Sequence, residues 1–194
     1  MTVFHARMIW LIGTLLWFAI RYPYQRRSRA VPKASSKDRR KERTLLAITG
    51  LLVHVVPMIY ALSGWPQFAD YPFHPAVAVI GAAVFAFGLW LFWRSHRDLG
   101  TNWSIALDIR AKHQLVTQGV YQYVRHPMYS AFWLNALGQL LLLPNWIAGP
   151  AGLFGIALLY FVRVAREERM MLETFGEDYR AYMARTRRLI PGIY

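Results

Sequence analysis

Arg125, His126 and Pro127 stand side by side at the start of an apolar run, within the stretch GVYQYVRHPMYSAFWL. Two interpretations are open. In the first, the arginine reaches toward lipid headgroups, nearby tyrosines form an interfacial belt, and Pro127 begins a helix where its missing N–H costs nothing. In the second, the unpaired N–H groups and positive dipole end of that helix bind a carboxylate or phosphate, with His126 as an added donor.

A second polar pair, Arg163 and Glu167, is four residues apart and therefore shares one face of a helix. On an exposed surface such a pair contributes little. However, only Leu143–Trp146 separate the two apolar segments before it, which favours a tight helical hairpin with antiparallel arms. The start of one arm and the end of the other then meet. This brings the motif RHPMY opposite Arg163 and Glu167, in a polar pocket that opens toward lipid.

The elements that position these residues are apolar, because 56% of the 194 residues are hydrophobic and 15% are aromatic. We predict an all-α integral membrane protein with five transmembrane helices, spans four and five forming the hairpin. It is a single membrane domain, 1–194, with three spans in 1–93 and a catalytic half in 94–194. The five apolar segments are Arg7–Ile20, Thr44–Leu62, Ala76–Trp93, Met128–Leu143 and Ile147–Val162.

The net charge of +13 is unevenly distributed. Of the 23 basic residues, all but Arg7 lie within Arg21–Arg43, Arg94–Arg125 and Arg163–Arg188, which are on one side of a five-span arrangement. Positive residues stay on the cytosolic side, so we predict an external N-terminus, a cytosolic C-terminus and a basic cytosolic loop at 21–43. No nucleic-acid-binding motif accompanies the charge, so we expect no nucleic-acid partner.

Three further patterns concern packing. Beyond the fifth span, apolar residues recur at steps of three and four, which predicts a cytosolic amphipathic helix interrupted near Gly176; these are Leu172, Phe175, Tyr179, Tyr182 and Met183. Small residues at intervals of three or four favour close contact between helices; these are Ala78, Ala82 and Ala86, and Gly149, Gly152 and Gly155. His54, three residues before Pro57, either bonds a carbonyl freed by a proline kink or has a function in the membrane.

Four motifs together make the chain recognisable: HQLVTQGVY at 113–121, RHPMY at 125–129, RVARE at 163–167 and FGEDY at 175–179. They resemble the isoprenylcysteine carboxyl methyltransferase family, whose wider relatives include phospholipid N-methyltransferases. The resemblance covers about residues 102–194 and is greatest to a compact prokaryotic member. It implies a protein of a prokaryotic cell membrane, and the distribution of basic residues predicts that its active site lies at the cytosolic face.

The resemblance also implies the methyl donor, S-adenosyl-L-methionine, which is held outside any Rossmann domain and leaves as S-adenosyl-L-homocysteine. No metal is implied. Arg163 would bind the substrate, and Arg163 and Glu167 are the expected catalytic residues. Carried over by motif position, the residues against the donor are His113, Leu115, Val116, Gly119, Tyr121, His126, Pro127, Met128, Tyr129 and Glu167.

The implied reaction is methyl transfer to a lipophilic acceptor drawn from the bilayer, a carboxylate of an isoprenylcysteine-like substrate that becomes a methyl ester. One alternative is a lipid amine N-methyltransferase on the same scaffold, for which Glu167 would be the general base. A second is a small transporter or scaffold. A transporter would need polar residues spread along a path and a paired repeat, whereas here the polar residues gather at one rim.

Overall fold

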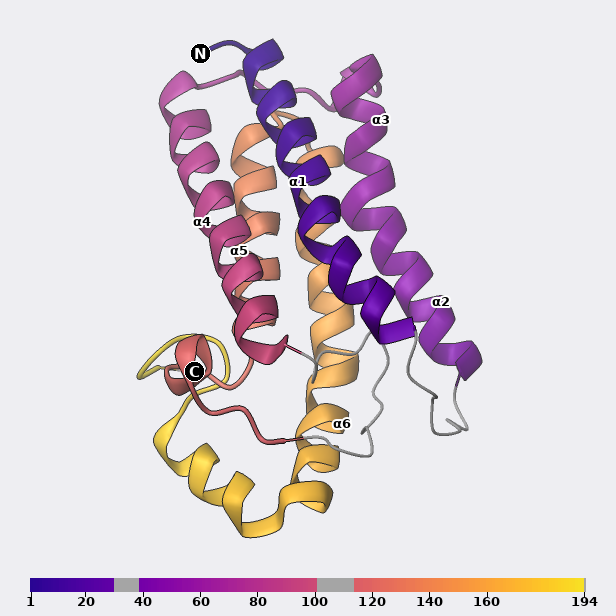
Figure 1. The fold of residues 1–194 in the computed structure, drawn as a ribbon. Coiled ribbons are helices and arrows are strands. Elements are labelled where there is room, and N and C mark those ends of the chain that lie inside the picture. Colours follow the sequence, from indigo (N-terminus) through magenta and orange to yellow (C-terminus); the bar gives the residue numbers. More distant parts are fainter. Residues whose placement is uncertain (30–38, 101–113, 194) are drawn as a thin grey trace.

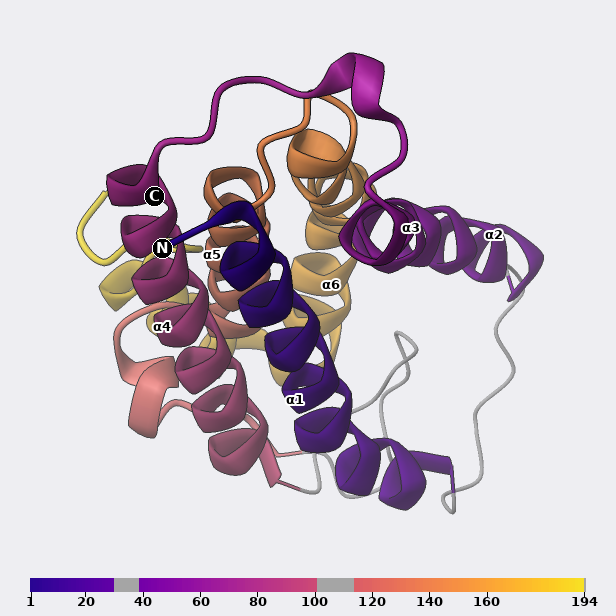
Figure 2. The same cartoon turned by 90° about the horizontal axis from the view of Figure 1, so that it is seen from above.

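The computed structural model describes residues 1–29, 39–100 and 114–193, which form a bundle of helices and no β-strands (Figure 1). The helices are α1 (Val3–Arg29), α2 (Arg39–Gly50), η1 (Leu51–Val55), α3 (Val56–Ser63), η2 (Gln67–Ala69), α4 (Pro75–Leu99), η4 (Gly119–Gln122), α5 (Pro127–Leu142) and α6 (Ala148–Arg185). Seen from above, α1 lies in front of α5, between α4 and the continuous α2–η1–α3 rod (Figure 2). The all-α prediction is confirmed.

Four helical stretches are long and apolar enough to cross a membrane: Val3–Arg27, Arg40–Ser63, Pro75–Leu99 and Ala148–Arg185. The length and apolar composition of these helices indicate an integral membrane protein. The fourth predicted span, α5, has 16 residues, fewer than the ~20 of a full crossing. It packs between α4 and α6 within the bundle (Figure 2). Five crossings and their orientation remain predictions.

The segment predicted as a basic loop, 21–43, is largely helical at both described ends. α1 continues to Arg29 despite Pro23, and α2 already begins at Arg39. Side-chain contacts explain the extension of α1: the Arg21 guanidinium lies 5.0 Å from the Trp17 ring centroid, and Tyr24 packs on His96. Such contacts stabilise helical turns in a region that its polar composition alone predicted to be a loop.

The predicted hairpin between α5 and α6 is present, and Asn145 organises its turn. The Asn145 side-chain oxygen accepts hydrogen bonds from the backbone N–H groups of Ile147 and Ala148, at 3.0 and 2.9 Å, and so caps α6. Its amide nitrogen donates to the Pro66 carbonyl and to Asp70, at 2.7 and 2.8 Å. One buried side chain therefore joins the hairpin to the loop between α3 and α4.

Small residues allow the close helix contacts that the sequence predicted, although the tightest of them lie at other positions. A Cβ atom on Gly138 of α5 would lie 2.7 Å from the Phe85 Cβ and 2.8 Å from the Phe85 nitrogen of α4. Gly152 leaves room for the Gln139 side chain, and Gly155 for η1. Gly149, Gly152 and Gly155 of α6 are therefore packing positions, as expected, and Gly138 is the tightest backbone approach between α4 and α5.

A Gly138→Ala variant is expected to lose about 1–3 kcal/mol of stability, because the added methyl group meets backbone atoms that cannot rotate away. Thermal unfolding in detergent measures the loss. Gly50→Ala is the matched control, since a Cβ there meets no atom within 4 Å and Gly50 has right-handed helical angles. Equal melting temperatures for the two variants would contradict the assigned contact.

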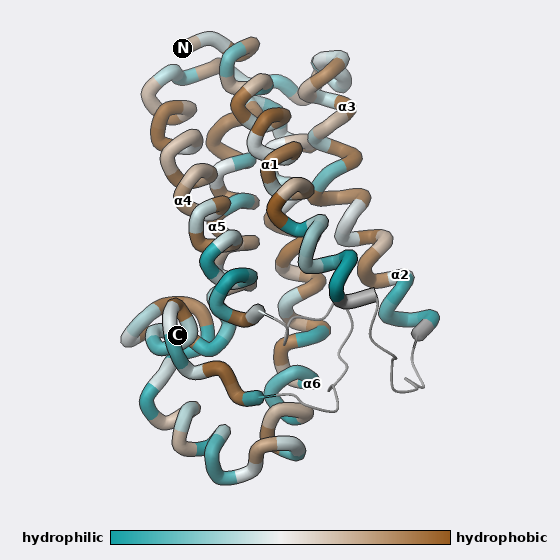
Figure 3. The backbone as a smooth tube through the Cα atoms, viewed as in Figure 1, coloured by the Kyte–Doolittle hydropathy of each residue, from teal (hydrophilic) through white to brown (hydrophobic). Residues whose placement is uncertain are grey.

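The polar residues of the fold gather at one end, where hydrophilic colours cover the lower ends of α1, α2 and α6 (Figure 3). This end, formed by residues 21–29, 39–43, 94–99 and 163–189 together with the RHP motif, is called the basic end below. Here α6 runs on well beyond the predicted fifth span, as one helix up to Gly176. Gly176 has φ 51°, so the chain bends, and the segment beyond it turns back beneath the bundle (Figure 1).

Candidate active site

A cavity of about 500 Å³ reaches from the basic end into the bundle between α1, α2, α5 and α6. Its deep part is lined by aromatic and aliphatic side chains such as Trp17, Phe132 and Leu159. Its part at the basic end is lined by ionisable and hydrogen-bonding groups. A single cavity therefore joins a polar chamber at the basic end to an apolar interior between the membrane-length helices.

The polar chamber is built from the start of α5 and the middle of α6. The Tyr129 hydroxyl donates to Glu167 at 2.7 Å, and the Arg163 Nε atom lies 3.3 Å from the same carboxylate oxygen. The His126 Nδ1 atom is 3.8 Å from the other oxygen. The antiparallel hairpin thus brings the RHPMY motif opposite Arg163 and Glu167, and Glu167 lies at the centre of the group.

Glu42 of α2 contacts Arg163 from behind the chamber and is not itself among the residues that line the cavity. Sequence reasoning did not identify it. Its carboxylate lies 3.5 Å from Arg163 Nη2, and the two side chains are only 12% and 10% exposed. Arg163 is therefore held between two carboxylates, Glu42 and Glu167. The only signal in the sequence was an acidic residue within a strongly basic segment, which does not identify a partner.

Directly beside the chamber, Glu168 is buried and joins three basic groups. It accepts hydrogen bonds from Arg125 Nε at 3.1 Å and from Arg188 Nη2 at 2.6 Å, and it lies 3.4 Å from His126 Nε2. Glu168 therefore links the first two residues of the RHP motif to residues 187–189, which are called the C-terminal segment below. The acidic pair at 167–168 was the available signal, but nothing in the spacing identified the second acid as the buried one.

The C-terminal segment also fixes the backbone of the motif. The Arg125 and His126 N–H groups donate to the carbonyls of Arg187 and Arg188, at 2.7 and 2.9 Å. The Ser130 hydroxyl donates to the Leu189 carbonyl at 2.7 Å. Residues distant in sequence thereby fix where α5 begins. The sequence analysis had attributed this helix start to Pro127 alone.

The turn before the motif is shaped by Asp98 of α4. Gly119 has φ 64°, and a Cβ there would lie 2.2 Å from Asp98, which accepts a hydrogen bond from the Val120 N–H at 2.9 Å. Gly119, predicted to contact the donor, therefore has a backbone role in this turn. Tyr121 follows it into the core, where burial raises the pKa of its phenol, and its carbonyl accepts from Tyr182.

The structure brings most of the predicted site residues to one cavity. Its lining includes Leu115, Val116, Tyr121, His126, Pro127, Met128, Tyr129, Arg163 and Glu167. Gly119 lies in the turn behind them, and His113 lies outside the described residues. The cavity also includes groups that the motifs did not indicate: Arg21 and Gln25 of α1, and Met170, Met171, Tyr179 and Tyr182 of α6. Tyr179 and Tyr182 belong to the predicted amphipathic segment, and their side chains lie on the face of it that lines the cavity.

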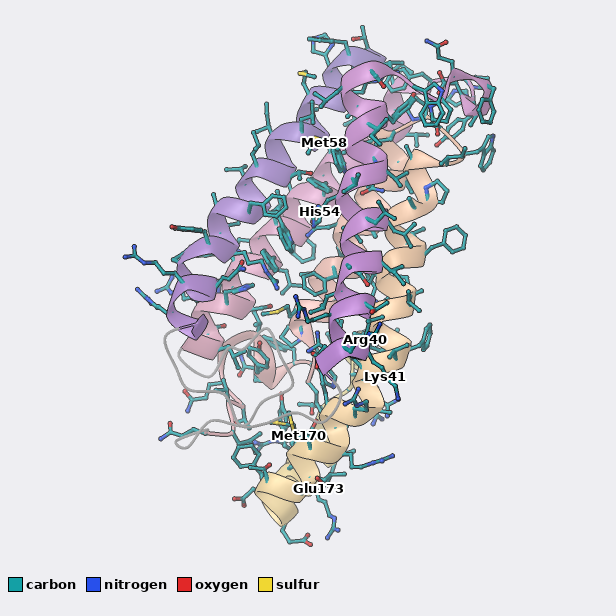
Figure 4. The ribbon with its side chains drawn as sticks, turned by 90° about the vertical axis from the view of Figure 1, so that its right-hand side faces the viewer. Arg40, Lys41, His54, Met58, Met170 and Glu173 are labelled. Carbon is teal, nitrogen blue, oxygen red and sulfur yellow. The ribbon has the colours of Figure 1, made fainter. Side chains whose placement is uncertain are left out.

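His54 lines the deep part of the cavity and makes no hydrogen bond through Nδ1, so the expected bond to a freed carbonyl is absent there. Its ring instead packs against Trp17 and Phe18, with centroids 4.8 and 4.9 Å apart. It projects from η1 toward α1 (Figure 4). Among the residues that the structure describes, no group of three or more His, Asp or Glu side chains could hold a metal ion.

Residues 78–173 match the isoprenylcysteine carboxyl methyltransferase (ICMT) family. A protein-S-isoprenylcysteine O-methyltransferase of Schizosaccharomyces pombe is 40% identical over 83 residues, which are 42% of this chain and 34% of the yeast protein. The human protein-S-isoprenylcysteine O-methyltransferase is 28% identical over 144 residues, 70% of this chain and 51% of the human one.

A solved structure of the eukaryotic intramembrane Ras methyltransferase ICMT has a similar fold, with a TM-score of 0.54 at 22% sequence identity. The likeness covers 79% of this chain and 53% of that one. The fold and cavity define a helical membrane protein whose polar chamber opens into an apolar interior. Over residues 78–173 the chain is similar to the isoprenylcysteine carboxyl methyltransferase family. It spans about half the length, or less, of these relatives.

Proposed function

We propose that the chain is a membrane-embedded methyltransferase that uses S-adenosyl-L-methionine to methylate the carboxylate of a lipophilic, isoprenylcysteine-like acceptor. The observation that carries this proposal is the single cavity that joins the chamber around Arg163 and Glu167 to an apolar interior. A lipid-soluble acceptor can place its tail in that interior while its carboxylate reaches the chamber. Similarity to the isoprenylcysteine carboxyl methyltransferase family supports the same reaction class.

The residues of the chamber fit the donor. The cavity of about 500 Å³ is within the usual range of ~300–1,000 Å³ for small-molecule sites. Glu167 can hold the ammonium of the methionine portion, while His126 and the α5 N-terminus suit its carboxylate. Leu115, Val116 and Tyr121 offer an apolar surface to the adenosyl portion. When bound, S-adenosyl-L-methionine supplies an electrophilic methyl group on a sulfonium.

Arg163 is the group that would orient the acceptor. A guanidinium can bind a carboxylate through two N–H groups, and the contacts with Glu42 and Glu167 hold this one at the chamber wall. A terminal carboxyl group has a pKa of about 3.3–3.7, so it is ionised at neutral pH and needs no general base. The chain's contribution is then to align the acceptor oxygen and to exclude water.

A lipid amine is the second candidate acceptor, and the two carboxylates beside Arg163 favour it. Glu42 and Glu167 could attract a cationic headgroup, and Glu167 could take the proton that an amine must lose. The products distinguish the two reactions. A base-labile methyl ester on an S-prenylated N-acetylcysteine supports the carboxylate reaction, whereas a stable N-methyl group on phosphatidylethanolamine supports the amine reaction.

We expect the purified protein in detergent to bind S-adenosyl-L-methionine and its demethylated product, measured by calorimetry. His126→Ala and Glu167→Ala should each weaken binding by about tenfold or more, because each removes a polar group that contacts the donor in this proposal. Glu177→Ala is the control, since it removes an exposed carboxylate of the same helix. Absence of binding by a well-folded wild-type protein, repeated in lipid, would reject the methyltransferase proposal.

A further inference from the structure

A second, more open hollow of about 410 Å³ lies on the outside of the bundle between α2 and α6. Figure 4 shows Arg40 and Lys41 at the beginning of α2, beside α6. This α2–α6 groove is separate from the cavity of the candidate active site, with which it shares no residue. It is lined by Arg40, Lys41, Thr44, Leu45, Ile48 and Leu158.

The lining of the groove changes from charged to polar to apolar with distance from the basic end. Two exposed cations stand at the basic end, at the first residues of the membrane-length stretch Arg40–Ser63. One turn further lies the Thr44 hydroxyl, and beyond it the floor is hydrocarbon, where Ile48 is 42% and Leu158 37% exposed. A ligand that matches this sequence has an anionic head, a polar neck and an apolar chain.

We propose that the α2–α6 groove binds an anionic phospholipid, with its phosphate against Arg40 and Lys41 and one acyl chain along Ile48 and Leu158. The apolar floor distinguishes this ligand from free phosphate, which would use only the two cations. The paired positive charges distinguish it from a zwitterionic phospholipid, whose headgroup has no net charge. The α2 N-terminus adds a favourable dipole for the same anion.

The opposite face of α2 belongs to the active site, so the groove and the site share one helix. Glu42 lies 3.5 Å from Arg163, and Leu46 and Thr49 line the cavity. A lipid that bridges α2 and Leu158 of α6 would hold α2 against α6 and keep Glu42 beside Arg163. This consequence for catalysis rests on the proposed function, whereas binding of the lipid does not.

The test of binding uses the full-length protein released from mixed micelles into native mass spectrometry. Wild type is expected to retain dioleoylphosphatidylglycerol in preference to dioleoylphosphatidylcholine. Arg40→Gln/Lys41→Gln should weaken retention by about fivefold for each cation removed. Arg26→Gln/Arg27→Gln is the matched control, because it removes the same charge from exposed positions on α1 outside the groove.

Retention lost in the groove variant and kept in the control would establish the site. Equal losses in both variants would show that the lipid is attracted by net charge alone, and this result would overturn the proposed site. Unchanged retention in the groove variant would also overturn it. Glycerol phosphate, which has the head and no chains, should not displace the lipid. Displacement by glycerol phosphate would mean that the two cations bind a phosphate without the apolar floor.

The consequence for catalysis is tested in nanodiscs with and without phosphatidylglycerol. Methyl transfer by wild type should rise with the anionic lipid, and the rise should vanish in Arg40→Gln/Lys41→Gln. Glu42→Gln should still retain the lipid and yet lose the rise, because the link from α2 to Arg163 is weakened. A rise that persists in Glu42→Gln would refute the coupling. Absence of methyl transfer in every disc would instead count against the proposed function, with lipid retention still deciding the groove.

Discussion

A Glu168→Ala variant is expected to lose about 3–5 kcal/mol of stability and its binding of S-adenosyl-L-methionine. The reason is charge burial: Arg125 and Glu168 are only 9% and 7% exposed at their side chains. Removing the carboxylate leaves the Arg125 guanidinium in the interior without its counter-charge, which costs far more than a surface pair contributes. Arg188 and His126 lose the same partner.

Thermal unfolding and donor binding are measured on the same detergent-purified samples. Glu177→Ala is the control, because its pair with Arg180 is largely exposed, at 82% and 66%, and should change stability little. Glu168→Gln separates charge from shape, since it keeps the hydrogen-bonding geometry and removes the charge. A Glu168→Ala protein that melts within a degree of wild type would show that the network does not hold the RHP motif.

The second large effect is expected at Arg163. Arg163→Gln should lower kcat/KM for carboxylate acceptors by about 30-fold or more, because truncating a buried charged partner costs about 2–5 kcal/mol. It should leave donor binding closer to wild type, since the chamber groups assigned to the donor remain. Arg163→Lys should recover only part of the activity, because an ammonium cannot make the paired N–H contacts of a guanidinium.

Arg169→Gln is the control for this prediction, because Arg169 is an exposed arginine on the same helix. The comparison also bears on the choice of acceptor. If Arg163→Gln abolishes ester formation and leaves N-methylation intact, Arg163 serves carboxylates specifically. Unchanged turnover of a carboxylate acceptor in Arg163→Gln would remove Arg163 from its assigned role.

The C-terminal segment contributes to the site through other residues. The carbonyls of Arg187 and Arg188 accept from the N–H groups of Arg125 and His126, and Arg188 also binds Glu168. The segment therefore buttresses the start of α5 without lining the cavity. The family model ends at residue 173, so the backbone contacts of Arg187 and Arg188 lie beyond its match. They were visible only in the tertiary structure.

Much of the fold could be predicted from the sequence, because it follows from local pattern. Apolar runs of membrane length predicted the helices, and the four residues Leu143–Trp146 predicted the hairpin between α5 and α6. The spacing of Arg163 and Glu167 then placed both on the face that meets RHPMY, and Tyr129 does contact Glu167. Helix periodicity and a short loop are enough to make these inferences.

The helix ends near the basic end were harder to predict. Composition indicated a loop over 21–43, yet α1 reaches Arg29 and α2 begins at Arg39. The extra turns of α1 are supported by packing of Arg21 on Trp17 and of Tyr24 on His96, contacts that a propensity argument does not contain. α6 also continues past the predicted fifth span, and it bends at Gly176, where φ is positive and where the sequence predicted an interruption.

The sequence by itself determined the class of protein, the helical hairpin and the residue types that meet at one rim, since these depend on hydrophobicity and on residue spacing. Only the tertiary structure decided which acids complete the site. Glu42 reaches Arg163 from the other half of the chain, and Glu168 rather than a neighbour is buried against Arg125. Such pairings depend on how distant helices pack, because a buried charge is stable only where its partner is brought to it.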